Sequence, residues 1–123
     1  MTTDAKREAK QCDELAQVMG YTVVRLEQRR ASKQHVGVPD RFIMGRNAFW
    51  FEMKFGRDKL SREQHTFLRT AMDAGSLASC GGLAELTEIL AALAKPTQVS
   101  ARNVCRKHID RYAEKGFRGE RAA

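Results

Sequence analysis

Residues 38–54 read VPDRFIM-GRN-AFWFEMK, and this stretch decides the fold of the chain. Two runs rich in aromatic and branched side chains flank Gly45-Arg46-Asn47, which predicts two antiparallel strands joined by a three-residue hairpin loop. In that register Asp40 lies directly opposite Glu52, so both side chains project from the same face of the sheet. Their Cβ atoms are then about 5 Å apart.

Lys54 follows Glu52 by two residues, so it projects from the same face about 7 Å further along the strand. Two carboxylates this close repel each other unless a cation joins them, and oxygen ligands suit Mg²⁺ or Mn²⁺. Such an ion activates a bound water and neutralises charge on a phosphoryl oxygen, while a neighbouring lysine orients the water or stabilises the transition state. The competing interpretation is a cross-strand salt bridge on a solvated face.

The order of Asp40 and then Glu52-Met53-Lys54 resembles the PD-(D/E)xK nuclease signature. The surrounding sequence is similar to a narrower family within that superfamily. Residues 37–40 read GVPD, residues 60–64 read LSREQ, and Gly75 follows a predicted helix. Together with the ExK triplet, these motifs resemble the VRR-NUC (virus-type replication-repair nuclease) domain.

The resemblance covers residues 4–93 and implies a restriction-endonuclease-like core that hydrolyses DNA phosphodiester bonds with Mg²⁺ or Mn²⁺. Asp40, Glu52 and the Met53 carbonyl would hold the metal. It implies action on branched or structured DNA in viral or bacterial replication, recombination or repair, and it favours a homodimer. One alternative is a non-catalytic DNA-binding or packaging-accessory module. Another is a restriction-type endonuclease. Such enzymes usually carry extra elements that read the DNA sequence, and a chain of 123 residues leaves little room for them.

The periodicity of the whole chain predicts an α/β protein with a mixed sheet (α+β) and the element order α-β-β-β-α-β-α. The predicted helices cover 4–19, 61–74 and 83–93, and the predicted strands cover 21–27, 38–44, 48–54 and 76–80. Strict alternation places Trp50 on the face of Glu52, and Phe49 and Phe51 on the opposite, core face. Residues 1–94 are expected to form the nuclease-like domain.

Glu8 interrupts the apolar face of the first predicted helix. With about 100° per residue it lies about 20° from Leu15, whereas Glu14 lies about 100° away. In the resembled family an acid on the first helix supports the metal, and Glu8 is the match, with Asp4 as its competitor. The other interpretation places Glu8 at the edge of the helix as a partner of the helix dipole.

Gln64 has two interpretations that are compatible with each other. Ser61 and Gln64 fit a capping box at the start of the second helix, and the resemblance places the same Gln64 near the active site as a catalytic residue. The basic residues expected to contact DNA phosphates are Lys33, Arg57, Lys59 and Arg62. The competing interpretation is that these four residues are ordinary surface charges without a binding function.

A net charge of +7 favours a polyanionic partner such as DNA. Residues 95–123 hold eight basic and three acidic residues, net +5, so residues 1–94 carry only +2. This basic C-terminal extension contains one predicted helix, capped by Ser100 and stopped by Gly116. Such a helix could cover its own domain, join a second subunit or carry basic side chains onto DNA, and the sequence does not choose.

The cysteines and histidines indicate neither a disulfide framework nor a zinc site. The chain has three cysteines, an odd number, with no CxxC spacing, and its histidines have no ligand spacing relative to one another. The N-terminus lacks an apolar leader, and no run approaches about 18 apolar residues. We therefore expect a soluble protein of the cytoplasm of a bacterium or of a virus-infected host cell.

Overall fold

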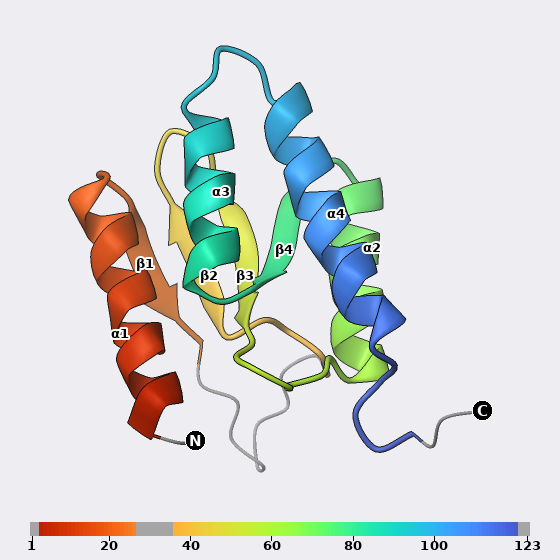
Figure 1. Cartoon of the computed structure of the whole chain (residues 1–123). Coiled ribbons are helices and arrows are strands. Elements are labelled where there is room, and N and C mark those ends of the chain that lie inside the picture. The colour runs from red at the N-terminus through yellow and green to blue at the C-terminus, as the bar shows by residue number, and fades with distance from the viewer. Residues whose placement is uncertain (1–2, 27–35, 121–123) are drawn as a thin grey trace.

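The computed structural model describes residues 3–26 and 36–120. In these residues four helices flank one four-stranded mixed sheet (Figure 1). The helices are α1 (Thr3–Val18), α2 (Arg62–Asp73), α3 (Leu83–Leu93) and α4 (Val99–Glu114). The strands are β1 (Thr22–Arg25), β2 (Arg41–Met44), β3 (Phe49–Met53) and β4 (Leu77–Gly81). The mixed α/β class and the predicted order of elements are confirmed, with α4 added at the C-terminal end.

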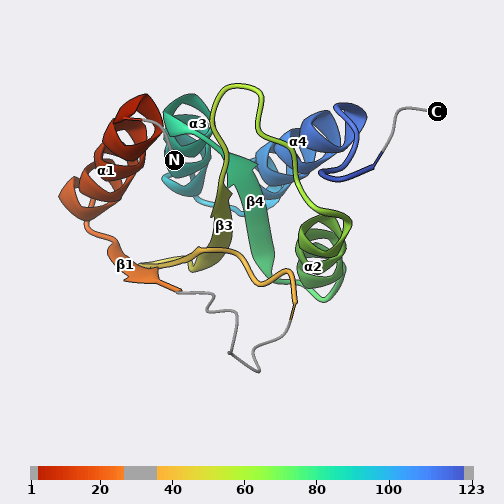
Figure 2. The same cartoon turned by 90° about the horizontal axis from the view of Figure 1, so that it is seen from below.

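The strands lie in the order β1-β2-β3-β4, with β4 parallel to β3 and the other neighbours antiparallel. Figures 1 and 2 show α1 and α3 side by side over one face of the sheet, and α4 running between α3 and α2 along β4. Trp50, the aromatic residue of β3 that points away from α1 and α3, contacts Phe67 on α2. No helix in the described part of the chain is long and apolar enough to cross a membrane.

The pairing of β2 with β3 confirms the predicted hairpin register. Arg41 pairs with Phe51 and Ile43 with Phe49, which leaves the three-residue loop 45–47 as the turn. The predicted strand from Val38 is shorter than expected, because β2 begins only at Arg41. Before it the chain turns at Val36 and Gly37 and then passes through Pro39, which has no N–H to donate to a strand partner.

The core lies mainly between the sheet and the pair α1 and α3. On that face of the sheet Ile43, Phe49 and Phe51 are at most 1% exposed. These aromatic rings pack edge to face, with 6.2 Å between the Phe49 and Phe51 centroids. The opposite face of the same strands carries the acidic and basic residues singled out by the sequence, together with half-buried aromatic side chains.

Helix α4 contributes to this same core. Its apolar side, including Cys105, Ile109 and Tyr112, is buried with the core residues of the sheet. The Ser79 hydroxyl on β4 donates a 3.0 Å hydrogen bond to the Cys105 carbonyl. The helix of the basic extension therefore covers its own domain. The predicted Ser100 cap is wrong, since the helix already begins at Val99 and its N-cap residue has no side-chain cap bond.

We expect Ile109→Ala to lower the free energy of unfolding by about 2–4 kcal/mol, because it opens a cavity between α4 and the sheet. Asp110→Ala is the matched neighbour, since its half-exposed carboxylate lies 3.8 Å from an equally exposed Arg69 guanidinium, and it should change stability by less than about 0.5 kcal/mol. Urea unfolding of both variants measures the difference. Equal small effects would show that α4 is not part of the folding unit.

Candidate active site

Asp40 and Glu52 meet where β2 begins and β3 ends. The Asp40 amide donates a 3.2 Å hydrogen bond to Glu52 Oε1, and the Met53 amide donates a 3.0 Å bond to Asp40 Oδ1. Each carboxylate thus accepts a hydrogen bond from a backbone N–H of the opposite segment, and the register of β2 and β3, continued by one residue, places the two acids opposite each other. The hairpin register alone brings two acids, twelve residues apart in sequence, to one point of the sheet.

Lys54 completes this cluster. Its Nζ lies 3.6 Å from Glu52 Oε2, and its own amide donates a 3.0 Å hydrogen bond to the Gly81 carbonyl on β4. Glu52 and Lys54 are each only 6% exposed. A salt bridge on a solvated face therefore does not describe these residues, since charged groups are rarely buried to this extent without a further reason.

Burial dominates the electrostatics of the two acids. Burial raises the pKa of Asp40, and the hydrogen bond from the Met53 amide offsets part of this effect. Burial and then the nearby Asp40 charge raise the pKa of Glu52 to about 7, against the opposing effect of Lys54. The two carboxylates titrate as a pair that retains a proton near neutral pH. A cation bound between them would displace that proton.

The backbone of Met53 points toward the same place. In an extended strand the N–H and C=O groups of one residue point to the same edge of the strand. The Met53 amide points at Asp40, while the next amide, that of Lys54, points the other way to β4. The Met53 carbonyl is therefore directed to the side of Asp40. Two carboxylates and a carbonyl are the oxygen donors that a hard divalent cation prefers.

Glu8 does not join the carboxylate pair. Within the described residues, no three His, Cys, Asp or Glu side chains are grouped so that they could hold one metal ion. Glu8 Oε2 instead accepts a 2.8 Å hydrogen bond from the Leu83 amide at the start of α3. A Cβ atom at Gly82 would overlap this carboxylate oxygen, so glycine at position 82 is what lets Glu8 reach the helix end. Glu8 acts here as a cap supplied by another helix.

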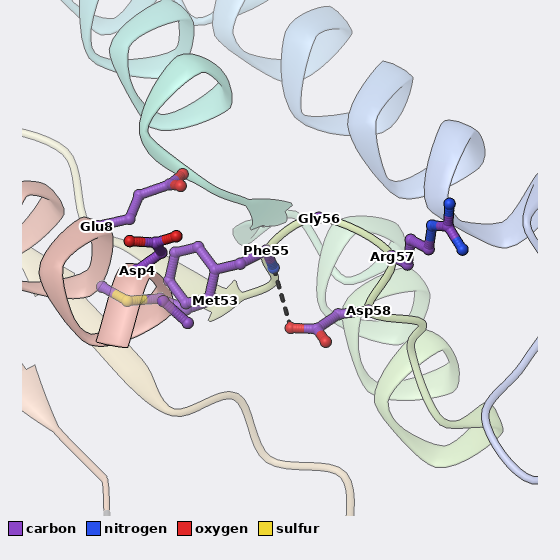
Figure 3. Close-up of a pocket in the computed structure, with 8 residues that line it drawn as sticks. Asp4, Glu8, Met53, Phe55, Gly56, Arg57 and Asp58 are labelled. Carbon is purple, nitrogen blue, oxygen red and sulfur yellow. Dashed lines mark hydrogen bonds between the residues drawn. The ribbon is translucent and has the colours of Figure 1, made fainter. Parts of the chain in front are cut away.

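A pocket of about 870 Å³ lies beside this contact, between α1 and the loop that follows β3. Figure 3 shows Asp4 and Glu8 on α1 facing the Met53 and Phe55 side chains, with Arg57 turned away from them. The Met53 side chain projects from the strand face opposite to Glu52. Glu8 and Asp4 therefore approach the end of β3 from the other side of the sheet.

The segment before Asp40 packs on the first turn of α2. Gly37 has a φ of +88°, and a Cβ atom there would overlap the Glu63 carbonyl oxygen. At the same turn the capping box is confirmed, with Gln64 Oε1 accepting a 2.8 Å hydrogen bond from the Ser61 amide. Gln64 is thereby fixed at the first turn of α2, and its backbone lies against Gly37, three residues before Asp40. Its catalytic role stays a prediction.

The predicted phosphate-binding residues differ in their surroundings. Arg57 and Lys59 are exposed on the loop after Lys54. Arg62 forms a two-pronged ion pair with Glu120, at 2.7 and 2.9 Å, and covers the Phe117 ring at 4.5 Å. This partner lies 58 residues away, and no residue near Arg62 in the sequence predicts it. Lys33 lies outside the described residues.

Arg41 is a supporting residue that sequence reasoning missed. It is 6% exposed, and its Nε and Nη2 lie 3.0 and 3.3 Å from the Asp13 carboxylate on α1. Its Nη1 donates a 3.2 Å hydrogen bond to the Asp40 carbonyl. The pair fixes the backbone of Asp40 from the face opposite to the acids. Strict alternation could have found it, because it places Arg41 on the core face of β2.

No known protein family, curated protein or solved structure matches this chain. The chemistry of the site therefore rests on the positions of its own residues. The structure brings Asp40, Glu52 and Lys54 together. It holds Gln64 in the capping box of α2 and engages Glu8 and Arg62 in other contacts.

We expect Glu8→Ala to lower the free energy of unfolding by about 1 kcal/mol, because the Leu83 amide loses its acceptor. Glu8→Gln keeps an acceptor oxygen and should lose less. Glu14→Ala is the control on the same helix, since the Glu14 side chain is 59% exposed and only 3.9 Å from a similarly exposed Lys10. Thermal unfolding ranks the three variants. A loss in Glu14→Ala equal to that in Glu8→Ala would remove the capping role.

The raised pKa of Glu52 predicts a pH dependence of stability in EDTA. The folded state holds the proton up to about pH 7, whereas the unfolded state releases it near its ordinary pKa of about 4.3. The stability that this group contributes is therefore complete below the unfolded pKa and is lost as pH rises through the folded pKa, by on the order of 3–4 kcal/mol. Urea unfolding from pH 4 to 8 should show this loss in the wild type and in Glu14→Gln, and a flatter profile in Glu52→Gln. Parallel profiles for the wild type and Glu52→Gln would contradict it.

Proposed function

We propose that this protein is an Mg²⁺- or Mn²⁺-dependent deoxyribonuclease that hydrolyses phosphodiester bonds. The observation that carries this proposal is the buried pair of Asp40 and Glu52, with raised pKa values and a buried Lys54 at 3.6 Å from Glu52. A protein gains no stability from burying two acids side by side. A buried carboxylate pair of this kind suits a divalent cation, and the bound cation would attract a phosphate of the DNA.

Each residue has a defined part in the proposed reaction. Asp40, Glu52 and the Met53 carbonyl would hold the metal, which when bound supplies a Lewis acid for the phosphoryl oxygen and the attacking water. The Lys54 ammonium, fixed against Glu52, places a positive charge where the phosphate becomes more negative. Gln64, fixed by its capping box, is proposed to contact the reacting groups from the start of α2.

The same residues support assignment to the VRR-NUC family with a restriction-endonuclease-like core. Gly37 of the GVPD motif is needed for close packing on α2, and Gln64 of the LSREQ motif holds the first turn of that helix. Both motifs thus help to fix the segments that lie before Asp40 and after Lys54, the residues of the carboxylate and ExK motifs. On this proposal the substrate is branched or structured DNA, the setting is viral or bacterial replication, recombination or repair, and the protein acts as a homodimer.

DNA as the partner is supported by charge. The chain carries +7, and the exposed Arg57 and Lys59 lie on the loop directly after Lys54. A phosphate backbone approaching the carboxylate pair would meet these side chains. A non-catalytic DNA-binding module would use the same basic residues but has no use for the buried acids, so removal of the acids separates the two functions.

We expect Asp40→Asn, Glu52→Gln and Lys54→Met each to reduce metal-dependent DNA cleavage by about 100-fold or more while DNA binding persists. Asp73→Asn, at the exposed end of α2, is the control and should cleave like the wild type. Cleavage is measured with labelled single-stranded, duplex, flap and four-way-junction DNAs in Mg²⁺, Mn²⁺ or EDTA. Full activity in any of the three site variants, or cleavage in EDTA, would sink the proposal.

A further inference from the structure

An aromatic strip lies next to the carboxylate pair on the same face of the sheet, formed by Phe42, Trp50 and Phe67. Phe42 and Trp50 are cross-strand partners with ring centroids 4.6 Å apart, and Phe67 on α2 lies 5.3 Å from Trp50. All three are half-buried, whereas Phe49 and Phe51 on the other face are 0% exposed. Phe42 and Trp50 therefore offer aromatic surface to a ligand, and the core residues do not.

Two hollows border the aromatic strip. One, of about 670 Å³, runs along α2 past Phe67, from Arg62 at the first turn to Ala74 at the last. The other, of about 300 Å³, is lined by Phe42, Trp50, Ser76 and Gln98. Helix α2 is about 18 Å long at about 1.5 Å per residue, so the larger hollow extends over the length of several nucleotides.

The strip and the acids are adjacent along both strands. Trp50 precedes Glu52 by two residues and Phe42 follows Asp40 by two, so each aromatic ring stands about 7 Å from the acid on its own strand. A base lies several ångströms from the phosphate of its own nucleotide. A strand with one phosphate at the pair can therefore place a neighbouring base on Phe42 and Trp50.

The lining of the smaller hollow suits a base. Aromatic rings stack on the flat face of any base, with little dependence on sequence. Gln98 also lines this hollow, and its side-chain amide donates a 2.8 Å hydrogen bond to Asn47 Oδ1, so a polar amide group lies beside the aromatic rings. In a duplex the base faces are covered by their neighbours. Only an unpaired nucleotide can present its face to this strip.

We propose that the aromatic strip binds an unpaired base of single-stranded DNA, next to the phosphate held at Asp40 and Glu52. The inference rests on the proposed function and narrows its substrate to DNA with a single-stranded segment beside the cleaved bond, such as a flap or a free strand. The excess positive charge of the chain, +7, attracts the backbone, and the strip selects strands whose bases are exposed.

Trp50 is the single tryptophan of the chain, so its fluorescence reports on the strip without a label. The probe is a short oligothymidylate, compared with a blunt duplex of the same length and with heparin, a polyanion without bases. The protein used is full-length Glu52→Gln in EDTA, so that the probe is not cleaved during the measurement. We expect the oligothymidylate to quench the fluorescence of Trp50, with half of the quenching at the same concentration as the midpoint of its anisotropy binding curve. The duplex and heparin should leave the emission of Trp50 unchanged. Equal quenching by heparin, or binding of the oligothymidylate without quenching, overturns the proposal.

Variants test the strip by a second measurement, with fluorescence anisotropy of labelled DNA. Trp50→Leu and Phe67→Leu should weaken oligothymidylate binding by about five- to hundredfold, and Trp50→Phe should recover most of the affinity. Tyr21→Leu changes a half-buried aromatic residue that packs on the other face of the sheet against Phe49, and it should bind like the wild type. Equal affinity of Trp50→Leu and Tyr21→Leu would also overturn the proposal.

The two proposals fail in different ways. Metal-dependent cleavage of the oligothymidylate by the wild type, without quenching of Trp50, would remove the strip and leave the nuclease. Quenching and stacking-dependent affinity without cleavage in Mg²⁺ or Mn²⁺ would remove the nuclease and leave a surface that binds single-stranded DNA. Absence of DNA binding by any measurement removes the strip.

Discussion

The burial of Asp40 beside Glu52 is the constraint on which the rest of the structure depends. Two carboxylates taken from water and placed side by side lose solvation and repel each other. Hydrogen bonds from the amides of Asp40 and Met53, together with the Lys54 ammonium, partly stabilise the ionised carboxylates. The pKa values of Asp40 and Glu52 are nevertheless raised, so the site still disfavours two negative charges. The surrounding fold must hold these residues in place.

The fold supports the pair from three directions. Strand β4 pairs with β3 through the last residues before Lys54, so the backbone of the ExK triplet lies inside the sheet and not at its edge. Arg41 and Asp13 tie the Asp40 backbone to α1 from the opposite face. The loop containing Gly37 packs on the first turn of α2. Each contact fixes one segment that carries or precedes a site residue.

Local rules predicted much of this arrangement. The hairpin register followed from a three-residue turn and alternation, and the capping box of Ser61 and Gln64 followed from four consecutive residues. The contacts that local rules do not predict join distant segments. Glu8 was recognised as an acid on a core face, but its partner at Leu83 lies 75 residues away. Arg62 was expected to face DNA, yet its guanidinium is paired with Glu120. Neither partner leaves a signal in the sequence near the residue that it engages.

Strand β3 shows how one short segment serves both stability and chemistry. Alternate side chains at Phe49, Phe51 and Met53 enter the core, and this packing determines where the intervening side chains point. Shifting the register by one residue would exchange the two sets, placing Glu52 in the core and Phe51 at the site. The hydrophobic packing of one face therefore fixes the positions of the acids and of Trp50 on the other.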